Sequence, residues 1–351
     1  MRNLVIILGT ALLLLPLQEA HGQEYVDGVE VIYLYRGMAM PKSSAAPWPT
    51  GVTSRRVRYF PVQHHVVRES NGSTTLPPGT TDALVDNLNT HFSDSITFYS
   101  CPSTNFINST HYYNNYHCSE EEVLRDAHNV EGVINLYYFN AMTCLNGEIW
   151  GYTYLPWWGD INFIALRNSN APTRATPVHE FGHFFGLPHT FEIWWGREQA
   201  NGSDCADDGD RFCDTPADYR ESRGSVNINC IYTGATVDEI GTRYSPDPRN
   251  FMTYPSSNNP ACRNRFTAQQ HSCMVGWANH SSRLAFNRAT VIENQTISGS
   301  RSYSNGQTCG IVVLRSATIA SDGHVTVSQP QAGTLLDKGF QVEVGGSLTI
   351  R

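Results

Sequence analysis

Apolar residues along the chain follow the spacing of strands in some segments and of helices in others. Residues 57–67 (VRYFPVQHHVV) are rich in β-branched and aromatic side chains and are predicted as a strand, whose proline is typical of an edge or a bulge. In residues 81–92, Leu84, Leu88 and Phe92 recur every four positions, which predicts an amphipathic helix. Further strands are predicted at residues 133–139, 148–154 and 161–166.

A second, short helix is predicted to begin at Ser119. Together with Glu122, this serine forms a capping box ahead of two apolar residues. Strands that alternate with helices in this order predict an α/β (α+β) fold with a mixed twisted sheet.

The amino-acid composition changes after about Asn287. Residues 290–351 are rich in Val, Ile, Thr, Ser and Gly, and turn sequences such as Ser321-Asp322-Gly323 separate short apolar runs. No helical period is present there, so this part is predicted as a small separate all-β module.

The start of the chain has the pattern of a secretory signal peptide. An apolar stretch at 4–17 follows a positively charged start, and Ala20 and Gly22 place small residues at a cleavage site. A membrane anchor is the alternative, but about 14 apolar residues fall short of the roughly 20 that span a bilayer. Residues 1–22 are therefore predicted as a signal peptide and 23–55 as an N-terminal extension, and no membrane span is expected.

Composition agrees with a folded, exported protein. The 351 residues are 40% hydrophobic and only 16% charged, which is too apolar for a disordered chain and long enough for one large domain and a smaller one. The net charge of -8 offers no basic surface for phosphate, so no nucleic-acid partner is expected. Nine cysteines in an exported chain predict disulfide bonds.

Residues 179–189 (HEFGHFFGLPH) carry the side chains for metal chemistry. His179 and His183 are four positions apart, so on a helix both imidazoles lie on one face and can bind one zinc ion. Glu180 projects about 100° round the helix, from where its carboxylate can address a metal-bound water without ligating the metal.

The second half of the motif supplies a turn and a third ligand. Gly186 can adopt the left-handed conformation that ends a helix, and His189 follows beyond the turn. Three protein ligands leave a fourth position open for water, which is the arrangement of catalytic zinc sites. Thr176 and Pro177 fit a helix start. If the helix begins earlier, the proline is expected to kink it, and the sequence leaves both possibilities open.

This segment resembles the long zinc motif of the metzincin metalloproteases. Residues 250–254 (NFMTY) resemble their methionine turn, with Met252 beneath the metal. Tyr254 matches the tyrosine that several metzincin families place beside the metal, where a phenol can donate to a developing oxyanion. A packed core tyrosine is the alternative.

Within the metzincins, the chain resembles the pappalysin (M43) family most closely. Residues 209–216 (GDRFCDTP) resemble its GDxxxDTP loop, and residues 265–270 (RFTAQQ) resemble the start of its last catalytic-domain helix, with Thr267 as N-cap. The resemblance implies a metzincin-like catalytic domain with an active-site helix. The expected organisation is a zinc metalloprotease catalytic domain at 56–287 and a C-terminal β module at 290–351.

An acidic loop lies between the zinc motif and the methionine turn. It contains Asp204, Asp207, Asp208, Asp210, Asp214 and Asp218. It is no EF-hand, because position 12 counted from Asp204 is Thr215, and a solvated loop is one interpretation. Pappalysins bind calcium in the matching loop, so the resemblance implies Ca²⁺ held by the side chains of Asp210 and Thr215 and the carbonyls of Gly209 and Phe212.

The cysteines fall into groups. Cys205, Cys213, Cys230 and Cys262 flank the acidic loop and the methionine turn and are expected to form two bridges, with three pairings possible. Three cysteines lie upstream and two downstream of this group. Because nine is an odd number, at least one thiol stays free or pairs outside the chain.

These observations predict a secreted zinc endopeptidase that acts on a protein or peptide. Glu180 is expected to take a proton from water and return it to the leaving amine, while Tyr254 and zinc stabilise the oxyanion. The peptide is expected to lie extended along the strand at 148–154. Two alternatives remain. One is a zinc hydrolase of other bonds, and the other is a zinc-retaining extracellular adhesin without turnover, whose β module contacts a cell surface.

Overall fold

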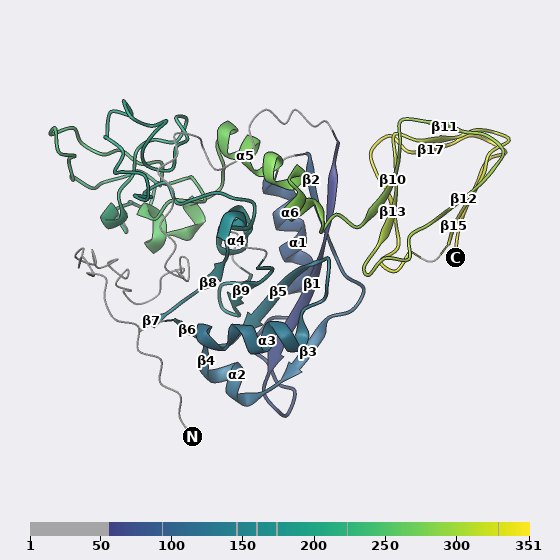
Figure 1. The fold of residues 1–351 in the computed structure, drawn as a ribbon, viewed down its shortest axis with the longest axis horizontal. Helices are drawn as coiled ribbons and strands as arrows, with labels where there is room; N and C mark the ends of the chain where they lie inside the picture. Colours follow the sequence, from purple (N-terminus) through teal and green to yellow (C-terminus); the bar gives the residue numbers. More distant parts are fainter. Residues whose placement is uncertain are drawn as a thin grey trace, which may run out of the picture.

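The computed structural model describes residues 56–351, apart from positions 93, 145, 146, 159, 160, 173, 174, 223 and 329. The predicted signal peptide (1–22) and N-terminal extension (23–55) lie outside the described residues. A sheet with helices on both faces forms the first part, and a coil made only of strands forms the second (Figure 1). The predicted fold class, α/β (α+β) with an additional C-terminal all-β part, is confirmed.

Six strands form the main sheet in the spatial order β2-β1-β5-β9-β8, with β3 pairing the second half of β1. All of these strand pairs are parallel except β8 with β9. The strands are β1 (Arg58–Arg68), β2 (Ile96–Ser100), β3 (Asn105–Asn108), β5 (Ile134–Phe139), β8 (Gly151–Thr153) and β9 (Ile164–Arg167). The antiparallel strand β8 therefore ends the sheet on the side where the chain continues to the zinc motif.

The strand predicted at 57–67 is present as β1, but of the two places expected for its proline, an edge or a bulge, the sheet edge is wrong. Strand β1 lies between β2 and β5. Pairing with β5 begins only at Val62, so the N–H that Pro61 lacks falls where this ladder starts and costs little.

Alternate residues of each strand face two separate cores, as the period of a strand requires. Leu136 and Tyr138 of β5 join a cluster with α1 (Thr80–His91) and α4 (Ala175–Phe184). Tyr137 and Phe139 join an aromatic cluster on the other face. That face is covered by α2 (Thr110–Asn115) and α3 (Glu121–His128).

Two predicted boundaries are corrected. The predicted strand at 148–154 is divided between β7 (Gly147–Glu148) and β8, because β7 pairs in a small sheet with β6 (Met142–Cys144) and β4 (Tyr116–His117), while β8 pairs with β9. The helix expected from Ser119 is α3, preceded by a 3-10 turn at Cys118–Glu120. The capping box belongs to this 3-10 turn and uses His117 and Glu120 in place of Ser119 and Glu122, and the imidazole of His117 accepts from Ser119 N.

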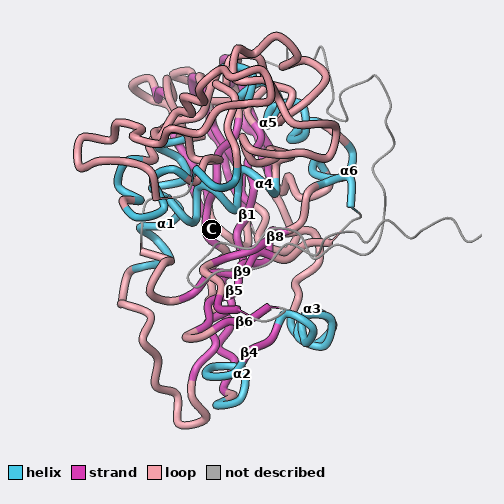
Figure 2. The backbone as a smooth tube through the Cα atoms, turned by 90° about the vertical axis from the view of Figure 1, so that its left-hand side faces the viewer, coloured by secondary structure: helices cyan, strands magenta, loops and turns pink. Residues whose placement is uncertain are grey.

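Between α4 and α5 (Ala268–Asn279) the described residues form short 3-10 turns, at Arg220–Ser222, Pro255–Asn258 and Pro260–Cys262, and isolated β-bridges. Figure 2 shows these loops gathered at one end of the molecule, above α4. Two disulfides hold them, Cys205–Cys213 and Cys230–Cys262, which settles the pairing that the sequence left open. As predicted, Thr267 caps α5 in a capping box with Gln270.

Residues 289–350 form a parallel β solenoid of three coils, seen as the triangular coil at the right of Figure 1. Ala289 pairs with Ile311, 22 residues further on, and Ser300 pairs with His324, 24 residues further on. Its strands are β10 (Ala289–Glu293), β11 (Thr296–Ile297), β12 (Ser300–Ser304), β13 (Ile311–Arg315), β14 (Thr318–Ile319), β15 (His324–Ser328), β16 (Thr334–Leu336), β17 (Gln341–Val342) and β18 (Ser347–Ile350). Aliphatic side chains such as Leu314 and Val327 fill its interior.

The solenoid is attached to the sheet by several contacts. Val57 and Tyr59 pack in one cluster with Ile311 and Val313 of β13. The disulfide Cys101–Cys309 joins the end of β2 to the second coil. The predicted domain boundary between residues 287 and 290 stays a prediction, because the cluster of Val57, Tyr59, Ile311 and Val313 includes residues from both sides of that boundary. Within the described part of the chain, no helix has the length and apolarity needed to cross a membrane.

Candidate metal centre

The first half of the zinc motif, with His179 and His183, lies on α4, which begins at Ala175 and ends at Phe184. The helix therefore starts before Pro177, but this proline still falls in the first turn, where its missing N–H has no helical partner to lose. Val178, Phe181 and Phe184 pack into the helix-side core, and this fixes the opposite face of α4, which carries His179 and His183.

Three imidazoles converge at the end of this helix. The Nε2 atoms lie 2.9 Å apart for His179 and His183, 3.1 Å for His183 and His189, and 3.3 Å for His179 and His189. Two nitrogens bound to one tetrahedral zinc at 2.0–2.1 Å would be separated by about 3.3 Å. The three rings are 1–2% exposed. Among the described residues, this is the group whose ligand atoms can hold a metal ion. The residues present therefore fit zinc.

Hydrogen bonds on the far side orient two of these rings. His179 Nδ1 lies 2.7 Å from the carbonyl of Phe251, and His183 Nδ1 lies 2.6 Å from the carbonyl of Leu187. A proton held on Nδ1 leaves the Nε2 lone pair free for a metal. Burial, together with the neighbouring imidazoles, holds the pKa of His189 well below its usual range, which keeps it in the neutral form that binds metals.

The turn to the third histidine has the conformation that the sequence predicts. Gly186 has φ +87°, and Leu187 N donates to Gly182 O at 3.0 Å. A Cβ on Gly186 would lie 2.2 Å from the Trp277 ring, so both conformation and space require glycine here.

Glu180 follows His179 on the helix and is fully buried between α4 and β8. A Cβ on Gly151 of β8 would lie 2.7 Å from Glu180 Oε1. The absence of a side chain at Gly151 thus makes room for this carboxylate, a role that the sequence alone did not reveal. In the described structure, Glu180 and the three histidines are each at most 2% exposed.

The predicted methionine turn lies beneath the histidines. Met252 is fully buried, and a Cβ on Gly182 of α4 would lie 2.9 Å from its sulfur. The Tyr254 ring lies 5.0 Å from that of His189 and 6.2 Å from that of His179, centroid to centroid. The roles of Met252 and Tyr254 at a metal stay predictions.

The acidic loop places its predicted calcium ligands together, but they bond to one another. Thr215 Oγ1 lies 2.9 Å from each oxygen of Asp210 and 2.6 Å from the carbonyl of Phe212, and its single proton is donated to one of these three oxygens. Burial, with the nearby charge of Glu198, raises the pKa of Asp210 well above its usual range. These contacts lie within the loop and do not by themselves support a calcium ion.

Glu198 is a buried carboxylate that the sequence analysis missed, because it lies outside the aspartate cluster. It is 2% exposed, and among the described residues neither of its oxygens has a hydrogen-bond partner. A Cβ on Gly209 would lie 2.6 Å from its Oε2. Burial, together with Asp204, Asp218 and Asp208, raises the pKa of Glu198 to about 8.

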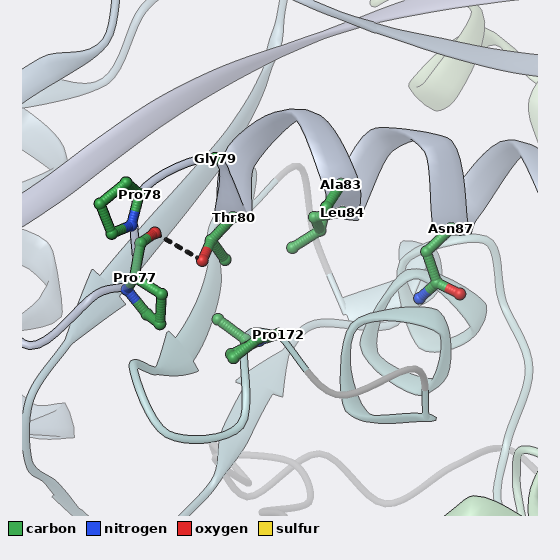
Figure 3. Close-up of a pocket in the computed structure, with 9 residues that line it drawn as sticks. Pro77, Pro78, Gly79, Thr80, Ala83, Leu84, Asn87 and Pro172 are labelled. Atoms are coloured by element: carbon green, nitrogen blue, oxygen red, sulfur yellow. Dashed lines mark hydrogen bonds between the residues drawn. The ribbon is translucent and has the colours of Figure 1, made fainter.

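A surface groove of about 470 Å³ lies elsewhere, at the start of α1 (Figure 3). Its lining includes Pro77, Thr80, Leu84 and Pro172, and none of the lining residues belongs to the histidine cluster. The groove has no part in the candidate centre.

All described cysteines but one are paired. In addition to the bridges above, Cys118 is bonded to Cys144, and Cys273 is the buried free thiol that the odd number requires. Four disulfides are typical of an oxidising compartment.

Comparison with known proteins identifies the class. The family described as pregnancy-associated plasma protein-A, peptidase M43, matches residues 117–279. An extracellular metalloprotease of Sordaria macrospora is 26% identical over 260 residues, which cover 68% of this chain and 81% of the fungal protein. Its counterpart in Colletotrichum graminicola is 28% identical over 164 residues, 42% of this chain, and the match spans only 50% of that relative's length.

Solved structures of promirolysin from Tannerella forsythia and of mirolysin in complex with a compound are also similar. They align at TM-scores of 0.47 and 0.45 with 17% identity, covering 67% and 66% of this chain and 85% and 96% of theirs. Residues 117–279 match the M43 family model, and relatives named extracellular metalloproteases are similar to the chain, which supports an M43 metzincin-like protease. The predicted resemblance is thereby confirmed, and the relatives' names agree with the predicted enzyme class, a metalloendopeptidase.

Proposed function

We propose that this protein is a secreted zinc-dependent endopeptidase. The observation that carries the proposal is the convergence of three Nε2 atoms within 3.3 Å, with Glu180 directly after the first ligand on the same helix. His179, His183 and His189 would hold the zinc ion. When bound, zinc supplies a Lewis acid that polarises a carbonyl and acidifies a water molecule.

The protein's own groups carry the proton and the charge. The Glu180 carboxylate accepts a proton from the attacking water and returns it to the leaving amine nitrogen. Its burial keeps other water away, so the proton moves along a defined path. The Tyr254 phenol, beside His189 and His179, donates to the oxyanion as charge develops there.

The substrate binds as an extended strand. Strand β8 ends the main sheet, and its outer main-chain groups are directed away from β9. A peptide that adds to this edge gains backbone hydrogen bonds and passes the helix that bears Glu180. Gly151 allows the two elements to approach closely enough for this geometry.

The test compares two buried glutamates. Glu180→Gln should keep one zinc per chain and lose peptide cleavage by about 10²–10⁴-fold, because the general base is gone. Glu121→Gln is the matched control, since Glu121 is 5% exposed and accepts from Tyr154 on the other face of the sheet. Metal analysis and cleavage of a peptide library measure both properties. Undiminished cleavage by Glu180→Gln would refute the mechanism.

The zinc-retaining adhesin remains a second candidate, and one observation favours it. The three histidines and Glu180 are each at most 2% exposed in the described structure. The surrounding loops must therefore move apart before a substrate can reach these residues. Wild-type protein that holds one zinc per chain but cleaves no member of the library would establish this alternative. Cleavage of model esters but not of peptides would instead identify a zinc hydrolase of other bonds.

A calcium ion in the acidic loop is part of the proposal. Asp210, Thr215 and the carbonyls of Gly209 and Phe212 would bind it, and the hydrogen bonds of Thr215 would have to open. Support comes from Glu198, a buried carboxylate beside Gly209 whose oxygens accept no hydrogen bond from the described residues. Calcium should then raise the melting temperature of wild type but not of Asp210→Asn. Equal melting with and without calcium would remove this ion from the proposal.

Secretion is likewise proposed. It rests on the predicted signal peptide, on four disulfides and on relatives that are named extracellular. Contact of the solenoid with a cell surface stays a proposal that no contact in the structure addresses.

A further inference from the structure

One buried carboxylate joins the two loops that frame the metal centre. Asp218 Oδ2 accepts a hydrogen bond from Thr190 Oγ1 at 2.8 Å and another from Thr253 Oγ1 at 2.6 Å. Its other oxygen accepts from Tyr219 N at 2.7 Å. All three side chains of this link, Asp218, Thr190 and Thr253, are at most 4% exposed.

The two threonines occupy defined places in the site. Thr190 directly follows His189, the third histidine, and Thr253 directly follows Met252 of the methionine turn. The loops also touch through their backbones, where Thr190 N donates to Met252 O at 3.2 Å. Asp218 therefore accepts hydrogen bonds from Thr190, which follows the candidate metal ligand His189, and from Thr253, which follows Met252.

Neither His189 nor Met252 belongs to a helix or a β-strand. His189 lies beyond the end of α4, and Met252 lies in a turn before α5. In such segments, side-chain hydrogen bonds fix the backbone, and bonds to a carboxylate are about twice as strong as those between neutral groups. A single oxygen that accepts from both loops also fixes their distance from each other.

We propose that Asp218 is a positioning residue of the metal centre, which sets the placement of His189 relative to the methionine turn through Thr190 and Thr253. The inference deepens the proposed function and rests on it for the identity of the metal. It does not require peptide hydrolysis, because ligand placement is measurable as metal affinity.

The test replaces the acceptor while keeping its shape. In Asp218→Asn the amide offers one acceptor atom, so the bonds to the two threonines and to Tyr219 N cannot all be retained. Asp238→Asn is the matched control, since Asp238 also accepts three bonds, from Ala200 N, Ile240 N and Thr242 N, but touches neither loop. Zinc affinity is measured by chelator competition, and the ligand field by the visible spectrum of the Co²⁺-loaded protein.

We expect Asp218→Asn to bind zinc 10–100-fold more weakly, with an altered Co²⁺ spectrum, and Asp238→Asn to match wild type. If the protein cleaves peptides, kcat should fall and KM should change little. Zinc affinity and Co²⁺ spectrum equal to those of wild type in Asp218→Asn would overturn the proposal, even if its melting temperature fell. A wild type that binds zinc but cleaves nothing refutes the proposed function and leaves this comparison intact.

Two further variants cover the case in which Asp218→Asn does not fold. Thr190→Val and Thr253→Val keep the side-chain volume and each remove one donor. Each should weaken zinc binding, and the double variant should lose less than the two effects combined, because both bonds serve one link. Full zinc affinity in both single variants would overturn the proposal.

Discussion

Two histidines in the middle of β1 should make the fold unstable in mild acid. His64 and His65 are 2% and 0% exposed. His64 Nδ1 lies 2.8 Å from the Tyr138 hydroxyl, and His65 Nε2 lies 2.9 Å from Asn135 Oδ1. The perturbation of interest is the replacement of both by glutamine, which has no proton to gain.

The magnitude follows from the pKa values. Burial, with the neighbouring His65, lowers the pKa of His64 to about 3, and burial is also the largest cause that lowers the pKa of His65 to about 4. In the unfolded chain both titrate near 6.5, so the unfolded state takes up protons first as the pH falls. Stability is therefore present above pH 6.5 and is lost below it. At pH 4 each histidine should cost about 3 kcal/mol, and a domain has only about 5–15 kcal/mol.

The assay is urea unfolding at several pH values between 7.5 and 4. Near pH 5 the wild-type free energy of unfolding should fall more steeply than that of His64→Gln/His65→Gln, by about 2.5 kcal/mol per pH unit. The metal-centre histidines titrate in both proteins and cancel in the comparison. His324→Gln, at an exposed position, should leave the wild-type slope unchanged. Parallel curves for wild type and the double variant would refute the reasoning.

Two further changes test close contacts. Gly151→Ala places a Cβ 2.7 Å from Glu180 Oε1, so cleavage should fall at least tenfold with about 1–3 kcal/mol of destabilisation, whereas Gly306→Ala, which meets nothing within 4 Å, should behave as wild type. Unchanged cleavage in Gly151→Ala would contradict the packing. Cys101→Ser/Cys309→Ser removes a disulfide between residues 208 positions apart in the sequence. The loss of loop-closure entropy in the unfolded chain makes this disulfide worth about 5 kcal/mol of stability, so the melting temperature should fall without it. An unchanged melting temperature would show that packing at Val57 and Tyr59 holds the solenoid without the bridge.

The site was predictable from the sequence where local geometry decides it. The spacing of His179 and His183 on a helix and the turn at Gly186 fix the ligands within eleven consecutive residues, and the structure reproduces both. Glu198 and Asp218 were not predictable in this way. Whether an acidic residue is buried depends on loops that meet only after folding, so a cluster of aspartates in the sequence does not show which carboxylate leaves the solvent.

Like the site, the fold is predictable where local sequence decides it and not where distant segments decide it. Helix α1 and strand β5 follow from local periodicity, whereas the interior place of β1 depends on β2, β3 and β5, which follow it in the chain. The C-terminal strands were expected, but not their parallel stacking. The runs that pair here, 289–293 (ATVIE) and 311–315 (IVVLR), are short and rich in β-branched residues, and such runs fit antiparallel pairing equally well.

The attachment of the solenoid has a consequence for its evolution. Its contacts with the enzyme part involve Cys309, Ile311 and Val313 of the second coil and Asp337 of the third, while each coil stacks on the previous one at about 4.8 Å. Addition of whole coils after the third would lengthen the structure in steps of that size without disturbing these contacts. The solenoid thus has the properties of an adjustable spacer, whose reach can vary while the orientation of the catalytic part stays constant.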